Sequence, residues 1–588
     1  MRLPCFRLNA AWIFAVALFV RLMVLVDFGH SDYLSPSGGD MQFYADWGKV
    51  LATGWHGSHA YYALPGYAMG LGALFRAVGY SPYTVAALQT LSEAAIAALI
   101  FSLTLWTFPV KRARVVGALA ALGWVFFQPA QAFSLVTMPT TWGVLALWTL
   151  VAWSARTESR CPWWPWPAIG LLAGLAATMV ATVLGVLVLT AVAAWRNLQR
   201  PGPFAAAVAL MLAGVLAGTS PCWYHNYVVM KDPVFLSGHS GLNFWIGNNP
   251  DANGYPKIPP GLRPTQAGLL RDSILTPEAD AGHELKRAEI SHYWAAKARE
   301  YIRQHPGAWV RLLGLKVCNF WNATQYDDLS LVTPMADEGV LTPGLRFGQV
   351  ALLGLAGLAL TWRRFPRSRW IAGSVLLSMA MLLPVFITER YRLPAVPGLL
   401  MLGAGGLAAL WEALAGRRWL TAGGWAAVAV AALFITRSPR PGALQARSLD
   451  DFNSGRLALE QGDLFTARAK LERAAEAAPD NADILTALGT YWLKMSNPEK
   501  ARGYYTWALK VNARTPTALN NLAILEMNEL HWARALTLLM QVLEIDPDDA
   551  KAQELVNCCN LRLQKEVPPE ASKTFMPPSG DPRAAPAP

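Results

Sequence analysis

The sequence has few charged residues for its length. Asp, Glu, Lys and Arg make up 15% of the 588 residues, whereas apolar residues make up 54%. Soluble domains carry about a quarter charged residues, so this composition excludes a soluble globular enzyme for most of the chain. The length also exceeds that of one ordinary domain, which predicts two or three structural units.

Sequence signals of several other protein classes are missing. The six cysteines form no CxxC pair, which argues against a zinc or disulfide framework. The formal charge is 50 − 39 = +11, but no basic stretch is interleaved with aromatic residues, so no nucleic-acid partner is expected. No Walker loop, Rossmann fingerprint or HExxH motif stands in a supporting context. All nine histidines lie outside the predicted spans, which argues against an intramembrane haem site.

Long apolar runs are abundant instead. The first, 10–28, follows Arg2 and Arg7 without a small-x-small cleavage site, which predicts a retained signal anchor. Residues 168–195 contain a polar break at Thr178–Thr182 and form either one long span or a hairpin of two short helices. We expect about 9 to 11 spans in all. The other runs of spanning length are 85–108, 115–134, 138–155, 204–221, 345–362, 370–388, 393–413 and 419–436.

Basic residues between the spans predict the orientation. If the clusters 111–114 and 363–369 both face the cytoplasm, the segment 168–195 must enter and leave on one side, which favours the hairpin. A first outer loop at 29–84, a large outer loop at 222–343 and everything after residue 437 then lie on the outer face. Arg437, Arg440 and Arg447 argue weakly for the opposite side.

The C-terminal part repeats with a period of 34 residues, which places Gly455, Gly489 and Ala523 in register. Small residues recur where paired helices approach closely, and the pattern resembles the tetratricopeptide repeat. It predicts a linker at 438–449, three repeats at 450–562 and a Pro-rich disordered tail at 563–588. A protein partner is expected in the concave face of the repeats, unless they serve only for oligomerisation.

The first outer loop combines a carboxylate with aromatic residues in GGDMQFYADWG (38–48). Asp40 follows the first span, Tyr44 lies one helical turn later, and Tyr62 belongs to a second aromatic cluster. A carboxylate at a membrane surface beside aromatic rings suits a general base for a lipid-linked or sugar substrate. The alternative is that Asp40 only caps the helix that follows.

The order of these segments resembles the GT-C glycosyltransferases, specifically the branch of protein O-mannosyltransferases and aminoarabinose transferases. The resemblance rests on GDMQFY, YYALPGY, GLNFWIGNNPDANG (241–254) and ERYRLPAVP (389–397). It implies an all-α fold, in which a polytopic membrane helix bundle of GT-C type over 1–437 precedes the tetratricopeptide α-solenoid.

The resemblance also implies roles for single residues. Asp40 would deprotonate an acceptor, which attacks the anomeric carbon of the sugar with inversion while polyprenyl phosphate leaves. Arg390 and Arg392 would bind the donor phosphate, unless they are snorkelling side chains that fix the depth of the span. The remaining candidates for substrate binding are Tyr44, Tyr62, Glu93, Asn243 and Asn248. The asparagines are alternatively turn residues, and Glu93 alternatively pairs with Arg21 inside the membrane.

Two segments depart from the family pattern. Relatives carry an acidic residue after the Pro that starts the fourth span and an Arg-Pro pair in the split segment, where this chain has Thr140–Thr141 and Met179–Val180. No metal ligand is therefore assigned, although the resemblance leaves a divalent metal open as a cofactor.

The expected function is transfer of a sugar from a polyprenyl-phosphate donor to an envelope acceptor, which is a lipid, a polysaccharide or a protein. The expected location is the outer face of a bacterial inner membrane. One alternative is a non-catalytic membrane scaffold for the repeats. Another is a transporter of a lipid-linked substrate that depends on Arg21 and Glu93 but not on Asp40.

Overall fold

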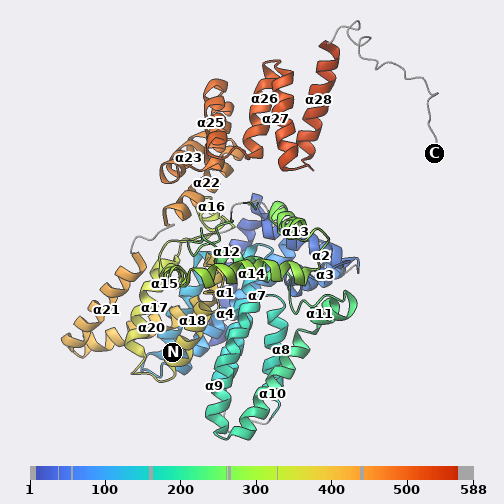
Figure 1. Ribbon diagram of the computed structural model, residues 1–588. Helices are drawn as coiled ribbons and strands as arrows, with labels where there is room; N and C mark the ends of the chain where they lie inside the picture. Colours follow the sequence, from blue (N-terminus) through green and yellow to red (C-terminus); the bar gives the residue numbers. More distant parts are fainter. Residues whose placement is uncertain are drawn as a thin grey trace, which may run out of the picture. The chain divides into compact units, whose positions relative to one another are not determined.

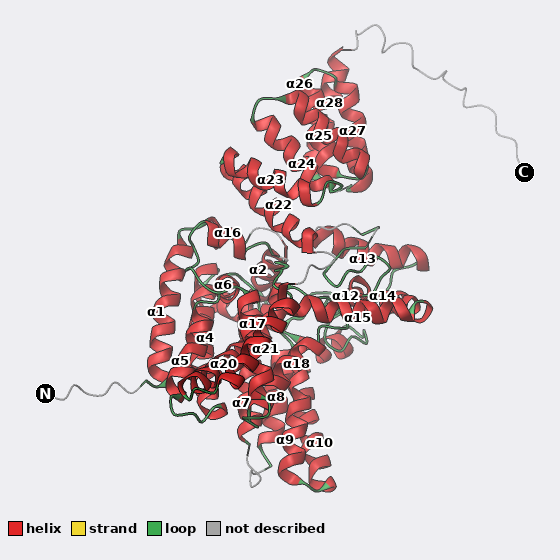
Figure 2. Ribbon diagram, turned by 90° about the vertical axis from the view of Figure 1, so that its left-hand side faces the viewer, coloured by secondary structure: helices red, strands yellow, loops and turns green. Residues whose placement is uncertain are grey.

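The regular structure of the protein is helical, as the sequence predicts (Figures 1 and 2). Its chain divides into two compact units, a membrane unit (1–446) and a repeat unit (447–588). Within the described residues the only extended pairing is an isolated bridge between Phe127 and Leu345. The computed structural model describes residues 8–36, 39–54, 57–157, 163–259, 261–262, 266–327, 329–437, 443–547 and 549–566.

Among the residues that the structure describes, six helices of the membrane unit are long and apolar enough to cross a bilayer. The first is the expected anchor helix, α1, and the last two are joined by a short basic turn. This supports a multi-pass membrane protein. The six are α1 (Ala10–Gly29), α4 (Pro82–Thr107), η2 with α9 (Ala181–Leu198), α10 (Pro201–Gly218), α19 with η4 and α20 (Glu389–Ala415), and α21 (Trp419–Arg437).

Other apolar runs are shorter or broken, so fewer long helices form than the sequence suggested. The run 115–134 divides into α5 (Ala113–Val125) and α6 (Gln128–Leu135). Between α6 and α7 (Thr140–Arg156) the chain bends by 117°. Pro129 opens α6 and Pro139 precedes α7, because proline fits the first turn of a helix but not its interior. The run 345–362 forms α17 (Phe347–Thr361).

The segment 168–195 is broken at the polar residues Thr178–Thr182, as the sequence indicated. Helix α8 (Pro165–Ala177) ends at the polar residues, and η2 (Ala181–Gly185) leads into α9 (Val186–Leu198). Helix α8 packs closely on α10, because a Cβ on Gly170 would lie 2.0 Å from the carbonyl oxygen of Met211. Such close backbone approach through glycine is typical of helices that pack inside membranes.

The expected span 370–388 is interrupted. Helix α18 (Ser368–Ala380) ends before Pro384, and residues 381–388 contain turns without helix. Proline has no N–H to donate and clashes with the preceding turn. The carbonyl groups left by this interruption bind side chains of the large outer loop, as described below.

The predicted outer loops fold into short helices. The first loop contains η1 (Asp32–Leu34), α2 (Gly39–Ala52) and α3 (Gly66–Val78). The large loop contains α11 (Ser220–Trp223), η3 (Tyr224–Val229), α12 (Ser240–Gly247), α13 (Gln266–Ala281), α14 (Arg287–Gln304), α15 (Pro306–Trp321) and α16 (Val332–Asp337).

The repeat unit consists of helix pairs with their own apolar cores. Its first helix begins inside the segment expected as a linker, whose residues 438–442 lie outside the described part, as does the expected tail from residue 567 onwards. Aligned small residues of successive repeats, Ala467, Ala501 and Ala535, are all fully buried. The helices are α22 (Ala443–Gln461), α23 (Leu464–Ala477), α24 (Ala482–Lys494), α25 (Pro498–Val511), α26 (Pro516–Asn528), α27 (Trp532–Ile545) and α28 (Ala550–Glu566).

Two glycines of the repeat unit offer a matched test of this packing. A Cβ on Gly489 would lie 2.5 Å from the ring of the buried Tyr505, whereas a Cβ on Gly503 would meet nothing within 4 Å. We expect Gly489→Ala to lower the free energy of unfolding by about 1–3 kcal/mol through overpacking. Gly503→Ala should raise it by about 0.5–1 kcal/mol, because alanine is the better helix former. Calorimetry of the full-length variants measures both, and equal effects would contradict the repeat packing.

Candidate functional site

An ion pair joins the two segments that the sequence singled out at opposite ends of the membrane unit. Asp40 lies in the first turn of α2, and Arg390 lies on α19. The Arg390 Nη1 donates to Asp40 Oδ2 at 2.7 Å. Both side chains are partly exposed, 26% for Asp40 and 12% for Arg390. The pair is therefore accessible, and it brings a carboxylate and a guanidinium together in one place.

Aromatic side chains form one wall beside Asp40. Tyr44 lies one turn further along α2, and its ring packs edge-on against Tyr67 of α3 at 5.3 Å. Burial raises the pKa of Tyr44, and the charge of Asp40 raises it further, so this phenol stays neutral. The Tyr67 hydroxyl donates to Gln89 Oε1 at 3.0 Å, and Gln89 Nε2 donates to the carbonyl groups of Ser134 and Val136. Gln89 thus fixes the wall to the membrane helix α4.

Tyr62 lies where the two outer loops meet. The backbone N–H groups of Gly238 and His239 donate to the carbonyl groups of Tyr61 and Tyr62. His239 Nδ1 also donates to the Tyr62 carbonyl at 2.8 Å. Burial raises the pKa of Tyr62, a hydrogen bond with Ser273 and the charge of Arg287 oppose this shift, and the charge of Asp40 adds to it. Burial lowers the pKa of His239, so its ring is neutral at pH 7 with Nδ1 protonated. Asn243 follows His239 by one turn on α12 and is partly buried.

Arg392 occupies a different environment from Arg390. It is 1% exposed and forms an ion pair with Glu389, which is equally buried. Its Nη1 donates to the Asn322 carbonyl at 2.8 Å and its Nη2 to the Thr324 carbonyl at 3.1 Å. Its guanidinium also lies over the ring of Phe347. These contacts hold α19, which begins the span Glu389–Ala415, against the residues that follow α15.

Asn248 is fully committed to contacts within the protein. Its Nδ2 donates to the carbonyl groups of Phe244 and Pro384, and its Oδ1 accepts from Trp309 Nε1 and Lys316 Nζ. Lys316 Nζ also donates to the Leu383 carbonyl at 2.8 Å. The carbonyl groups of Leu383 and Pro384, which follow the end of α18, are thus bound by Lys316 of α15 and by Asn248. In this structure Asn248 supports the loop rather than facing a substrate.

The buried Lys316 predicts a pH-dependent stability. Burial lowers the pKa of Lys316 from 10.5 to about 7. Between pH 7 and pH 10 the unfolded chain binds a proton that the folded chain lacks, so this residue makes stability rise with pH. Relative to the native protein, Lys316→Met should therefore be most stable below pH 7. This advantage should fall by about 1 kcal/mol per pH unit above it. Denaturation between pH 6 and pH 10 measures this slope, which the exposed Lys297→Met should not change.

Glu93 lies in the interior of the membrane unit. Its Oε2 accepts from Arg21 Nη2 at 2.9 Å, and both side chains are at most 2% exposed. Arg21 also donates to the Trp124 carbonyl at 3.1 Å. The Thr141 hydroxyl, in the first turn of α7, lies against the same carboxylate. The alternative of an Arg21–Glu93 pair is therefore what the structure contains.

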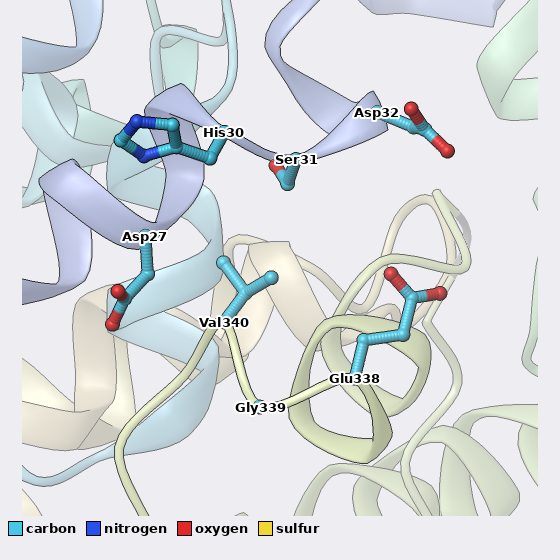
Figure 3. A pocket seen from close by; sticks show the side chains of 7 residues that line it. All are labelled: Asp27, His30, Ser31, Asp32, Glu338, Gly339 and Val340. Atoms are coloured by element: carbon cyan, nitrogen blue, oxygen red, sulfur yellow. The ribbon is translucent and has the colours of Figure 1, made fainter.

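A hollow of about 490 Å³ lies at the end of α1 (Figure 3). Asp27, His30 and Asp32 come from the end of α1 and the following turn, and Glu338 and Val340 come from the segment after α16. The Tyr33 hydroxyl donates to Glu338 at 2.8 Å. None of the residues that line this hollow is an arginine or a lysine, so it does not suit a phosphate group.

One group in the described ranges has three potential metal ligands close together: Glu526, Glu529 and His531 of the repeat unit. Arg502 forms ion pairs with both glutamates. Because a cation already neutralises these carboxylates, the group fits a metal ion poorly.

Comparisons with known proteins do not establish a family for this chain. No family model matches the chain, and no curated protein matches it. Among solved structures, 20% of this chain is similar to the first TPR of Spaghetti (RPAP3) bound to HSP90 peptide SRMEEVD, at 17% identity. The match covers 94% of that chain with a TM-score of 0.19. This likeness is too weak to carry an argument about function.

Proposed function

We propose that the membrane unit is a glycosyltransferase of GT-C type. It transfers a sugar from a polyprenyl-phosphate donor to an envelope acceptor at the outer face of a bacterial inner membrane. The observation that supports the proposal is the contact between Asp40 and Arg390, because the reaction needs a base and an anion-binding cation side by side. The two residues come from GDMQFY and ERYRLPAVP, two of the four motifs on which the family resemblance rests.

In this mechanism Asp40 accepts the proton of the acceptor hydroxyl or amine. The acceptor atom attacks the anomeric carbon, the bond from that carbon to the phosphate oxygen breaks, and the configuration inverts. Arg390 stabilises the charge that develops on the leaving phosphate through charge-assisted hydrogen bonds. The partly buried Tyr44 and Tyr62 supply aromatic surface for the sugar. Asn243 of α12 binds hydroxyl groups of the sugar.

Arg392 and Glu93 have supporting roles in this proposal. Arg392 is enclosed by Glu389 and by backbone carbonyl groups, so it positions α19 and thereby Arg390. Glu93 pairs with Arg21 and lies one turn after Gln89 on α4, the helix to which Gln89 fixes the aromatic wall. Neither needs to touch the sugar for the reaction to proceed.

The repeat unit is proposed as a module that binds a protein partner. It has separate apolar cores, and it keeps large apolar side chains exposed, among them Phe465 at 88%. A stack of helix pairs presents an extended surface of this kind to a peptide or an acceptor protein. We propose that it lies on the outer face with the catalytic site.

The direct test uses the full-length protein in lipid with a panel of labelled polyprenyl-phosphate sugars and envelope extract as the acceptor. Release of the free carrier phosphate is measured with time. Turnover of one donor supports the transferase. Absence of turnover with every donor contradicts it and favours the membrane scaffold for the repeats.

A further inference from the structure

An apolar surface lies just beyond the end of the candidate span α10, on the segment formed by α11 and η3 (Figure 1). Two residues of η3, His225 and Asn226, are buried. The other four are at least 46% exposed, and none of them is charged: Tyr224, Tyr227, Val228 and Val229. Contiguous exposed apolar side chains of this kind mark a surface that a partner or a membrane covers.

A contact with α10 fixes the place of this segment. The Trp223 indole N–H donates to the Leu216 carbonyl oxygen in the last turn of α10, at 2.8 Å. Leu216 is itself exposed, as expected of a side chain that faces lipid. Because Trp223 directly precedes η3, the exposed surface of η3 begins beside the last turn of the span.

The ends of α4 and α10 that join the two outer loops lie on one side of the membrane. The loops are hydrogen-bonded to each other, since the Gly238 N–H donates to the Tyr61 carbonyl at 2.9 Å. The start of α4 carries an exposed tyrosine, Tyr83. Tyrosine and tryptophan at the ends of spans are typical of the interface between lipid headgroups and acyl chains. The aromatic residues of α11 and η3 have the composition of such a belt.

The buried face of η3 binds the first outer loop. Asn226 Oδ1 accepts from the Tyr61 N–H at 2.9 Å. The His225 ring stacks on the Tyr61 ring with 4.2 Å between their centroids, and its Nε2 donates to the His59 carbonyl at 3.2 Å. The segment η3 is a π-helix, a rare conformation that is frequent at functional sites. Because Tyr61 is held in this way, the position of the adjacent Tyr62 depends on η3.

We propose that η3 is a membrane anchor for the first outer loop. Its exposed side chains lie in the bilayer at the level of the headgroups and upper acyl chains, while its buried side chains hold Tyr61 at a fixed height. The partner is the lipid surface, because η3 is continuous with a span and the first charged residue after that span is the exposed Lys231. A lysine in this position contacts headgroup phosphates. The anchor does not depend on the transfer reaction.

Quenching of a fluorescent amino acid in the full-length protein, reconstituted in nanodiscs of phosphatidylcholine, tests the lipid contact. The fluorescent residue replaces Val228 in one variant and Arg299, an exposed residue of the polar helix α14, in the control. A nitroxide near the top of the acyl chain should quench at position 228 at least about threefold more strongly than at position 299, because interfacial side chains reach the boundary between headgroups and acyl chains. Iodide in the water should quench in the opposite order.

Two results of this experiment overturn the proposal. Stronger quenching by iodide at position 228 than at position 299 would place the surface in water. Protection of position 228 from both quenchers would show that a protein partner or a second copy of the chain covers it.

Hydrogen exchange of the Tyr61 N–H measures the link to the loop. Asn226→Ala removes its acceptor and gives the rate for a released loop. Val228→Asp with Val229→Asp places two charges in the lipid interface, so we expect exchange to rise about 10- to 100-fold toward that rate. The matched control, Arg299→Asp, changes the net charge by the same amount on α14 and should leave the exchange rate unchanged.

Unchanged exchange in the double variant overturns the anchoring role, even where lipid quenches position 228. An equal rise in Arg299→Asp also overturns it, because the effect then follows the net charge. The quenching measurement introduces no charge into the interface, so it decides the lipid contact even if the double variant fails to fold.

Discussion

Replacing Asp40 with Asn should abolish transfer while leaving the fold intact. Asn keeps the size of the side chain and can still accept a hydrogen bond from Arg390, but it cannot accept a proton from the acceptor. General-base catalysis contributes about 10²–10⁴-fold to rate, so we expect release of the carrier phosphate to fall by at least about 100-fold. The measurement is single-turnover release from the donor identified in the panel.

The matched control lies on the same helix. Asp46 is exposed, and its carboxylate accepts from Gln42 and Lys49 at the surface of α2. Asp46→Asn removes the same charge six residues away without touching Arg390, so turnover should stay within about twofold of the native rate. Equal losses in the two variants would point to a general effect of charge on α2, and full activity of Asp40→Asn would discard Asp40 as the base.

The Asp40 variant also reports on donor binding. Without the carboxylate, the charge of Arg390 is no longer neutralised, so a short isoprenyl phosphate without sugar should bind more tightly while turnover is lost. Loss of both activities together would indicate a structural role for Asp40. A gain in affinity with loss of rate is the pattern expected of a base paired with a phosphate-binding arginine.

The features predicted well from the sequence are those encoded locally. The anchor helix is predicted from an apolar run and the repeats from a fixed period. Both patterns can be recognised without any information on the rest of the fold. The lengths of the spans were predicted less well, because apolar composition continues through Pro384 while the helix does not.

The candidate site shows the same limit. Arg390 and Arg392 look equivalent in ERYRLP, yet two residues along a helix point about 200° apart, and only one of them meets Asp40. The roles of Gln89 and His239 depend on contacts between segments that lie far apart in the sequence. No local pattern marks His239, so it was missed.

Breaking the pair of Arg21 and Glu93 should produce the largest loss of stability in the membrane unit. Glu93→Gln leaves the Arg21 guanidinium buried without an opposite charge, and Arg21→Met leaves the Glu93 carboxylate in the same position. Removal of one partner of a buried pair costs about 3–5 kcal/mol. Unfolding of the full-length protein by denaturing detergent, followed by tryptophan fluorescence, measures the loss.

The double variant Arg21→Met with Glu93→Met should recover most of that stability. Methionine approximates the volume of either side chain, and replacing both partners removes the charges instead of stranding one of them. Recovery requires the two residues to act on each other, so two additive losses would contradict the pair. The surface pair of Arg364 and Glu412 offers the control, since breaking an exposed pair costs at most about 1 kcal/mol.

Activity of the double variant then decides between functions. If Glu93 only holds α4 in place, the double variant should release carrier phosphate at close to the native rate, because Gln89 and the aromatic wall remain. A transporter that moves its substrate past intramembrane charges would lose activity in the double variant even though the fold is restored. If the double variant recovers its stability and keeps its turnover, Arg21 and Glu93 have a structural role, and Asp40 and Arg390 are the residues that take part in the reaction.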